Sequence, residues 1–70
     1  MPRLPSRKAK DIARLLESRG FTLHRTRGSH AIYINFQSER MVVVPMHTRD
    51  LPKGTLLEIL KQAGLSREDL

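Results

Sequence analysis

His30 is the residue of this 70-residue chain best placed to do acid–base chemistry. It follows the stretch Arg27-Gly28-Ser29 and begins a run of alternating residues. A neutral imidazole can accept the proton of a ribose 2′-hydroxyl, after which the 2′-oxygen can attack the adjacent phosphorus and cleave RNA without a metal ion. We expect His30 to be half-buried beside cationic side chains, where desolvation and like charge both favour the neutral imidazole. A strand-end histidine that bonds a loop carbonyl is the alternative role.

Basic and small residues near His30 form a candidate phosphate-binding set. Arginine side chains bind phosphate oxygens by charge-assisted hydrogen bonds and would stabilise the negative charge that builds up during cleavage. Lys53 stands at the expected start of a helix, whose unpaired N–H groups and positive dipole end also favour phosphate. Gly28 can instead simply supply a positive φ for a hairpin turn, and Ser29 a turn hydroxyl. The residues predicted to bind RNA or phosphate are Arg25, Arg27, Gly28, Ser29 and Lys53.

The other two histidines carry weaker predictions. His47 follows the third expected strand, so it could protonate a leaving group, contact a phosphate, or be a solvated loop histidine. His24 is expected to be merely exposed. The spacing of the three histidines does not match a metal site, and the seven acidic residues are scattered without a paired cluster for Mg²⁺. We therefore expect neither a metal nor another cofactor.

The positive charge of the chain is concentrated in its first half. Thirteen basic and seven acidic residues give a net charge of +6. Residues 1–30 contain eight bases and two acids, whereas residues 31–70 contain five of each, so the whole excess lies in residues 1–30. A localised excess of this kind favours a polyanionic partner such as a nucleic acid.

The length and composition predict one small domain, residues 1–70, with only shallow sites. The chain has no cysteine, which fits a reducing compartment. It shows neither the apolar run of a signal peptide nor a membrane-spanning segment. We expect a soluble cytoplasmic protein without a membrane partner.

Hydrophobic periodicity predicts an α+β domain with the order αβββα. A helix over about 7–19 would have Ser6 as its N-cap and Gly20 just beyond its end. Period-two alternation then predicts three strands, and Pro45 ends the last of them. A second helix would have Pro52 at its first position and close at Gly64, and Ser66 could cap one more short turn. The expected strands are 21–26, 30–36 and 41–44.

This order with short connections implies an antiparallel meander with both helices on one face. The strand directions place the first turn, the end of the third strand and the starts of both helices at one end of the domain. We therefore expect a single basic rim there, formed by Arg7, Lys8, Lys10, Arg25, Arg27, Gly28, Ser29, His30, His47 and Lys53.

The second expected strand has two faces of different polarity. Ile32, Ile34 and Phe36 form the more apolar set, so we expect them, with His30 at the rim, to face the helices. Tyr33 would then point away from the helices, where it could stack on a base, contact a protein, or be half-exposed without a role.

An ordered set of segments along almost the whole chain resembles the HicA (YcfA-like) family of small bacterial mRNA-interferase toxins. The matching segments are "LLESRGF" (15–21), "RTRGSH" (25–30), "VVVPMH" (42–47) and "LPKGTLLEILKQAGLS" (51–66).

The resemblance implies a fold similar to double-stranded RNA-binding domains and a single catalytic histidine after the Gly-Ser turn, which is His30 here. It also implies an mRNA substrate and a HicB-type antitoxin protein that covers this histidine. His47 matches a histidine of less clear role. We expect a metal-independent endoribonuclease that yields a 2′,3′-cyclic phosphate and does not cut DNA. The alternatives are a non-catalytic double-stranded RNA-binding module, although Lys53 alone replaces the usual lysine cluster, and a degenerate toxin that only binds its partner.

Overall fold

The expected αβββα order is confirmed by the computed structural model, which describes residues 7–46 and 50–70. Three antiparallel strands form one sheet in the order β1-β2-β3. The elements are α1 (Ala9–Ser18), β1 (Thr22–Arg27), β2 (His30–Asn35), β3 (Arg40–Pro45), α2 (Lys53–Ala63) and a 3₁₀ turn, η1 (Arg67–Asp69).

Helix α1 begins later than its sequence suggests. Lys8 occupies the cap position with extended backbone, and Ser6 lies outside the described residues. The two residues before the helix pair with the segment before α2. Lys8 forms an isolated antiparallel bridge with Asp50, and the Arg7 carbonyl accepts a hydrogen bond of 2.9 Å from the Leu51 N–H. This pairing holds the starts of α1 and α2 together.

Both helices end at a glycine with a positive φ, as predicted. After α1, Gly20 has φ 91°, and the N–H groups of Gly20 and Phe21 donate to the carbonyls of Glu17 and Leu16. This is the Schellman pattern, which satisfies carbonyls that the helix end would otherwise leave unpaired. Gly64 closes α2 in the same conformation, with φ 74°.

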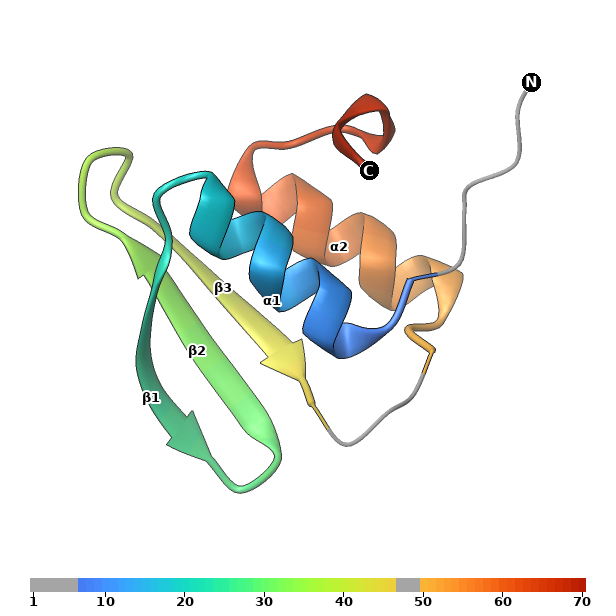
Figure 1. Cartoon of the computed structure of the whole chain (residues 1–70), viewed down its shortest axis with the longest axis horizontal. Coiled ribbons are helices and arrows are strands. Elements are labelled where there is room, and N and C mark those ends of the chain that lie inside the picture. Colours follow the sequence, from blue (N-terminus) through green and yellow to red (C-terminus); the bar gives the residue numbers. More distant parts are fainter. Residues whose placement is uncertain (1–6, 47–49) are drawn as a thin grey trace.

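The helices form one layer and the sheet a second layer behind them (Figure 1). Side chains of both helices and of β2 and β3 fill the space between the layers, whereas all six residues of β1 are exposed. The buried core consists of Ala9, Ile12, Ala13, Leu16, Phe21, Ala31, Tyr33, Val42, Val44, Leu51, Leu56, Ile59, Leu60 and Ala63.

The faces of β2 are opposite to those expected from the sequence. Ala31 and Tyr33 are buried at 3% and 4% exposure, and they pair across the sheet with Val44 and Val42, which are fully buried. Ile32 and Ile34 are only partly buried and therefore lie on the other side. The prediction that Ile32, Ile34 and Phe36 face the helices, and that Tyr33 points away from them, is wrong. We call the side turned away from the helices the open face of the sheet.

The C-terminal segment closes the end of the helical layer. Ser66 and Asp69 form a reciprocal capping box at η1, and Asp69 also receives a hydrogen bond of 2.8 Å from Arg19 at the end of α1. Among residues 7–46 and 50–70, no helix is long and apolar enough to cross a membrane.

Candidate functional site at the first hairpin and the open face

The β1–β2 hairpin sets the position of His30. Arg27 and His30 pair across the sheet, so Gly28 and Ser29 alone form the turn. Gly28 has φ 61°, whereas Ser29 has none of the positive φ that a type I′ turn would need. A positive φ at the first position only is the pattern of a type II′ turn, which favours glycine there. The expected backbone role of Gly28 is therefore confirmed.

His30 lies on the open face, at the end of the sheet where the hairpin turns. Its cross-strand neighbours are Arg27 on β1 and Pro45 on β3, and residues paired in this way share a face. The ladder continues one step further, because the Met46 N–H donates to the Ser29 carbonyl at 2.7 Å. His30 is exposed, so the expectation of a half-buried imidazole facing the helices is wrong. A solvent-facing imidazole can be reached directly by a large substrate.

A β-bulge in β1 determines which way its arginines point. Leu23 pairs with Tyr33 and Arg25 pairs with Ile32, so His24 is an extra residue with no partner of its own. Strict alternation from Leu23, which shares the helix-facing side with Tyr33, would have put Arg25 and the arginine two residues later on that side as well. The bulge shifts them instead onto the open face, beside His30.

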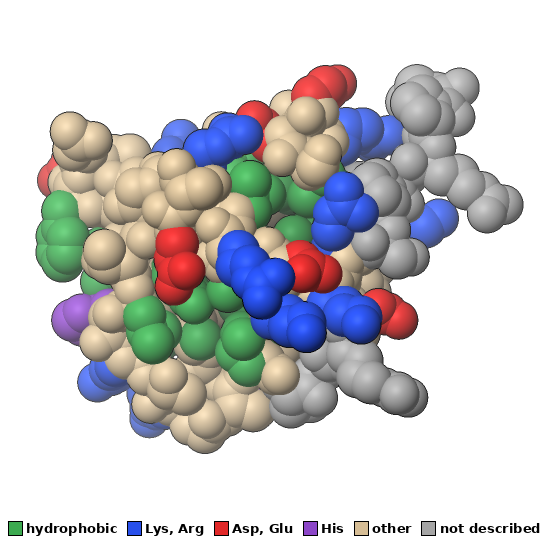
Figure 2. Space-filling view, in the orientation of Figure 1, with side chains coloured by type: hydrophobic (Ala, Val, Ile, Leu, Met, Phe, Trp, Pro, Cys, Tyr) green, Lys and Arg blue, Asp and Glu red, His purple; other side chains and the backbone are tan. Residues whose placement is uncertain are grey.

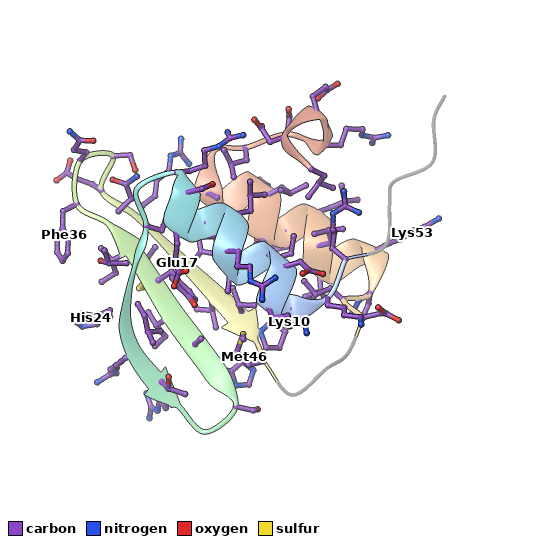
Figure 3. All side chains as sticks on the ribbon, viewed as in Figure 1. Lys10, Glu17, His24, Phe36, Met46 and Lys53 are labelled. Atoms are coloured by element: carbon purple, nitrogen blue, oxygen red, sulfur yellow. The ribbon has the colours of Figure 1, made fainter. Side chains whose placement is uncertain are left out.

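Apolar side chains occupy the rest of the open face. Met41 pairs with Ile34, and Val43 pairs with Ile32, in two rows behind the row that contains His30. Met41 is 58% exposed. Phe36, at the turn after β2, is 74% exposed and points away from the helices (Figure 3). Sequence reasoning missed this surface because the same apolar pattern also fits a core.

The expected basic rim is divided into two groups. The arginines of β1 lie by the first hairpin, whereas Lys53 points outward at the opposite side of the molecule from His24 and Phe36 (Figure 3). Figure 2 likewise shows basic side chains near that hairpin and a separate set over the starts of the helices, where acidic side chains lie among them. The structure brings Arg25, Arg27, Gly28 and Ser29 together with His30, but it does not bring Lys53 to them.

The remaining predicted residues contribute less to this site. His24 is exposed, as expected, and points away from the helices (Figure 3). His47 lies outside the described residues. Within the part of the chain that the structure describes, no three His, Asp or Glu side chains are grouped closely enough to hold a metal ion.

The arrangement offers an imidazole, two guanidinium groups and an apolar surface on one exposed sheet face. None of the curated proteins compared with the chain matches it. A family model described as the HicA toxin of bacterial toxin–antitoxin systems matches residues 9–65, which include both helices and the whole sheet. The chain therefore belongs to the HicA family of toxins from bacterial toxin–antitoxin systems.

Proposed function

We propose that this HicA-family protein is a metal-independent endoribonuclease that cleaves mRNA and thereby arrests translation and growth. The observation that carries the proposal is the position of His30, which is exposed on the open face and paired in register with Arg27. Cleavage by the ribose 2′-hydroxyl would use a general base and a cation that stabilises charge on the phosphate, and these two residues can supply both.

In this mechanism His30 takes the proton of the 2′-hydroxyl. The 2′-oxygen then forms a bond to the adjacent phosphorus, and the bond from phosphorus to the 5′-oxygen of the next nucleotide breaks. The protonated imidazole returns its proton to that leaving oxygen. Arg25 and Arg27 bind the phosphate oxygens and stabilise their charge. The products are a 2′,3′-cyclic phosphate and a 5′-hydroxyl, and DNA is not a substrate because it lacks the 2′-hydroxyl.

The proposal includes a protein partner. A HicB-type antitoxin would block the reaction by covering His30, which lies on an exposed face and is accessible to another protein. Binding of such a partner would also stabilise this small domain by mass action. An mRNA substrate would place the pair in the cytoplasm.

The test compares the wild type with His30→Ala. Induced expression should stop growth for the wild type only, and the purified variant should cleave RNA at least about 100-fold more slowly, the usual contribution of a general base. The fold should survive, since His30 is exposed and contributes no buried side chain to the core. His24→Ala removes a second exposed histidine from the sheet and should keep cleavage close to the wild-type rate.

The chemistry of the substrate provides an independent check. Once a cut site is mapped, RNA with a single 2′-deoxy or 2′-O-methyl group at that nucleotide should resist cleavage there. Equal cutting of the substituted RNA would contradict the proposed role of His30. A non-catalytic RNA-binding module would bind RNA, and a degenerate toxin would bind its antitoxin, but neither would lose growth arrest through His30→Ala.

A further inference from the structure

The open face has a chemical composition that the cleavage step alone does not explain. Behind the row that contains His30, the partly exposed side chains of Ile32, Ile34, Met41 and Val43 form an apolar surface that no helix of the described residues covers. Phe36 follows in the turn at the far end of β2, where its exposed side chain points away from the helices (Figure 3). A bare apolar sheet face on a small protein is a site for a ligand or a partner.

The charge of the sheet indicates the kind of ligand. None of the three strands contains an aspartate or a glutamate, and Arg25 and Arg27 lie along one edge of the apolar rows. The acidic residue closest to the strands in sequence is Glu39, in the turn before β3. Strands that carry an apolar surface, a cationic edge and no acidic side chain are suited to a polyanion that also has flat apolar groups.

Single-stranded RNA has both features, because its bases are free to stack on side chains while its phosphates follow a basic edge. A duplex keeps its bases stacked inside and would leave the apolar rows and Phe36 without a contact. From His30 to Asn35 the strand spans about 17 Å, at about 3.3 Å per residue, and Phe36 follows it directly. Other RNA-binding sheets stack two or three bases on a surface of this kind.

We infer that a single-stranded segment of the substrate lies across the open face, with its bases over Phe36 and the isoleucines of β2 and its phosphates along Arg25 and Arg27. The RNA strand would continue along this face to His30, so the open face would hold the nucleotides on one side of the scissile phosphate. The inference rests on the proposed function for its biological meaning, but binding can be measured without any cleavage.

The experiment measures the affinity of the full chain for a fully 2′-O-methylated single-stranded oligonucleotide, which this mechanism cannot cut. Phe36→Ala should weaken binding about tenfold, or about 1.4 kcal/mol, which is typical for the loss of one base–aromatic stack. Phe36→Trp should retain the affinity. Leu57→Ala is the matched control, because Leu57 is also an exposed large apolar residue, at 44%, but lies on α2.

Salt dependence tests the phosphate edge separately. Arg25→Gln should reduce the slope of log affinity against log salt concentration by about 0.7, the value for one lost phosphate contact on a single strand. Arg14→Gln should leave the slope unchanged, since Arg14 lies on α1 within 3.8 Å of Asp11.

Unchanged affinity in Phe36→Ala would overturn the inference, and so would tighter binding of a duplex of the same sequence. If the natural ligand of this face is a protein and not RNA, Phe36→Ala should leave the affinity for the oligonucleotide unchanged. Failure of the nuclease proposal would look different: the wild type would not cleave, or His30→Ala would still cleave, whatever the affinities are.

Discussion

Two adjacent residues of β2 allow the orientation of the sheet to be tested. Tyr33 is buried against the helices and pairs with the fully buried Val42, whereas Ile32 is partly exposed on the open face. Replacing each by alanine should therefore have very different costs. The site depends on this orientation, because His30 and Ile32 share a face.

The magnitudes follow from burial. Truncation of a large buried aromatic residue to alanine costs about 3–5 kcal/mol of unfolding free energy, through lost transfer and the cavity left behind. Ile32→Ala should cost less, about 1–2 kcal/mol, because that side chain is only partly buried. A chain of this length has a total stability of about 4–10 kcal/mol, so Tyr33→Ala removes at least about 30% of it. Tyr33→Phe keeps the ring and should be nearly neutral.

Urea unfolding followed by far-ultraviolet circular dichroism measures all three variants. If Tyr33→Ala is unfolded in buffer, the series is repeated with every protein in the same concentration of a stabilising osmolyte. A larger loss in Ile32→Ala than in Tyr33→Ala would refute the reasoning. In that case β2 would turn its other side to the helices and His30 would not lie on an open face.

Three further predictions concern single sites. Gly54→Ala should stabilise the protein by up to about 1 kcal/mol, because Gly54 is helical and no other atom lies within 4 Å of an added Cβ. Gly64→Ala should destabilise the protein by about 1–2 kcal/mol, because the φ of Gly64 is 74°. Thermal unfolding measures both changes. Burial, and secondarily the charge of Glu17, raise the pKa of Tyr33. An absorbance titration of this only tyrosine should therefore have its midpoint above 10 and shift down, though not fully, in Glu17→Gln. Hydrogen bonds lower the pKa of Asp69, so its contribution to stability is present above the pKa of the unfolded chain and lost as the pH falls through the lower folded value; Asp69→Asn should reduce the difference between the melting temperatures at neutral and acidic pH.

The order of elements and the ends of both helices follow from local signals that the sequence states clearly. Gly20 and Gly64 have the positive φ that their positions after the helices predict, and Gly28 has a positive φ in the hairpin turn. Each of these depends on the backbone of a few consecutive residues. Local chemistry is therefore sufficient to place the turn that carries His30.

The faces of β2 could not be predicted in the same way, because both alternating sets along this strand are largely apolar. The larger set, Ile32, Ile34 and Phe36, fits a core better on its own. The orientation of β2 is determined by its pairing with β3. Val42 and Val44 are fully buried, and their partners Tyr33 and Ala31 therefore also face the helices. This is register information, which one strand does not contain.

The bulge at His24 shows why a site can depend on information of this kind. Leu23 and Arg27 are four residues apart, so regular pleating would place them on the same face; with one extra residue they lie on opposite faces. Leu23 thus stays on the helix-facing side with Tyr33, while Arg27 joins His30. The bulge lets the strand begin with an apolar side chain on the helix-facing side and end with cations beside the base, which regular alternation could not do. A bulge in an uncovered edge strand also discourages pairing with other chains, as do the charges it carries. One inserted residue therefore both protects the edge of the sheet and aligns the arginines with His30.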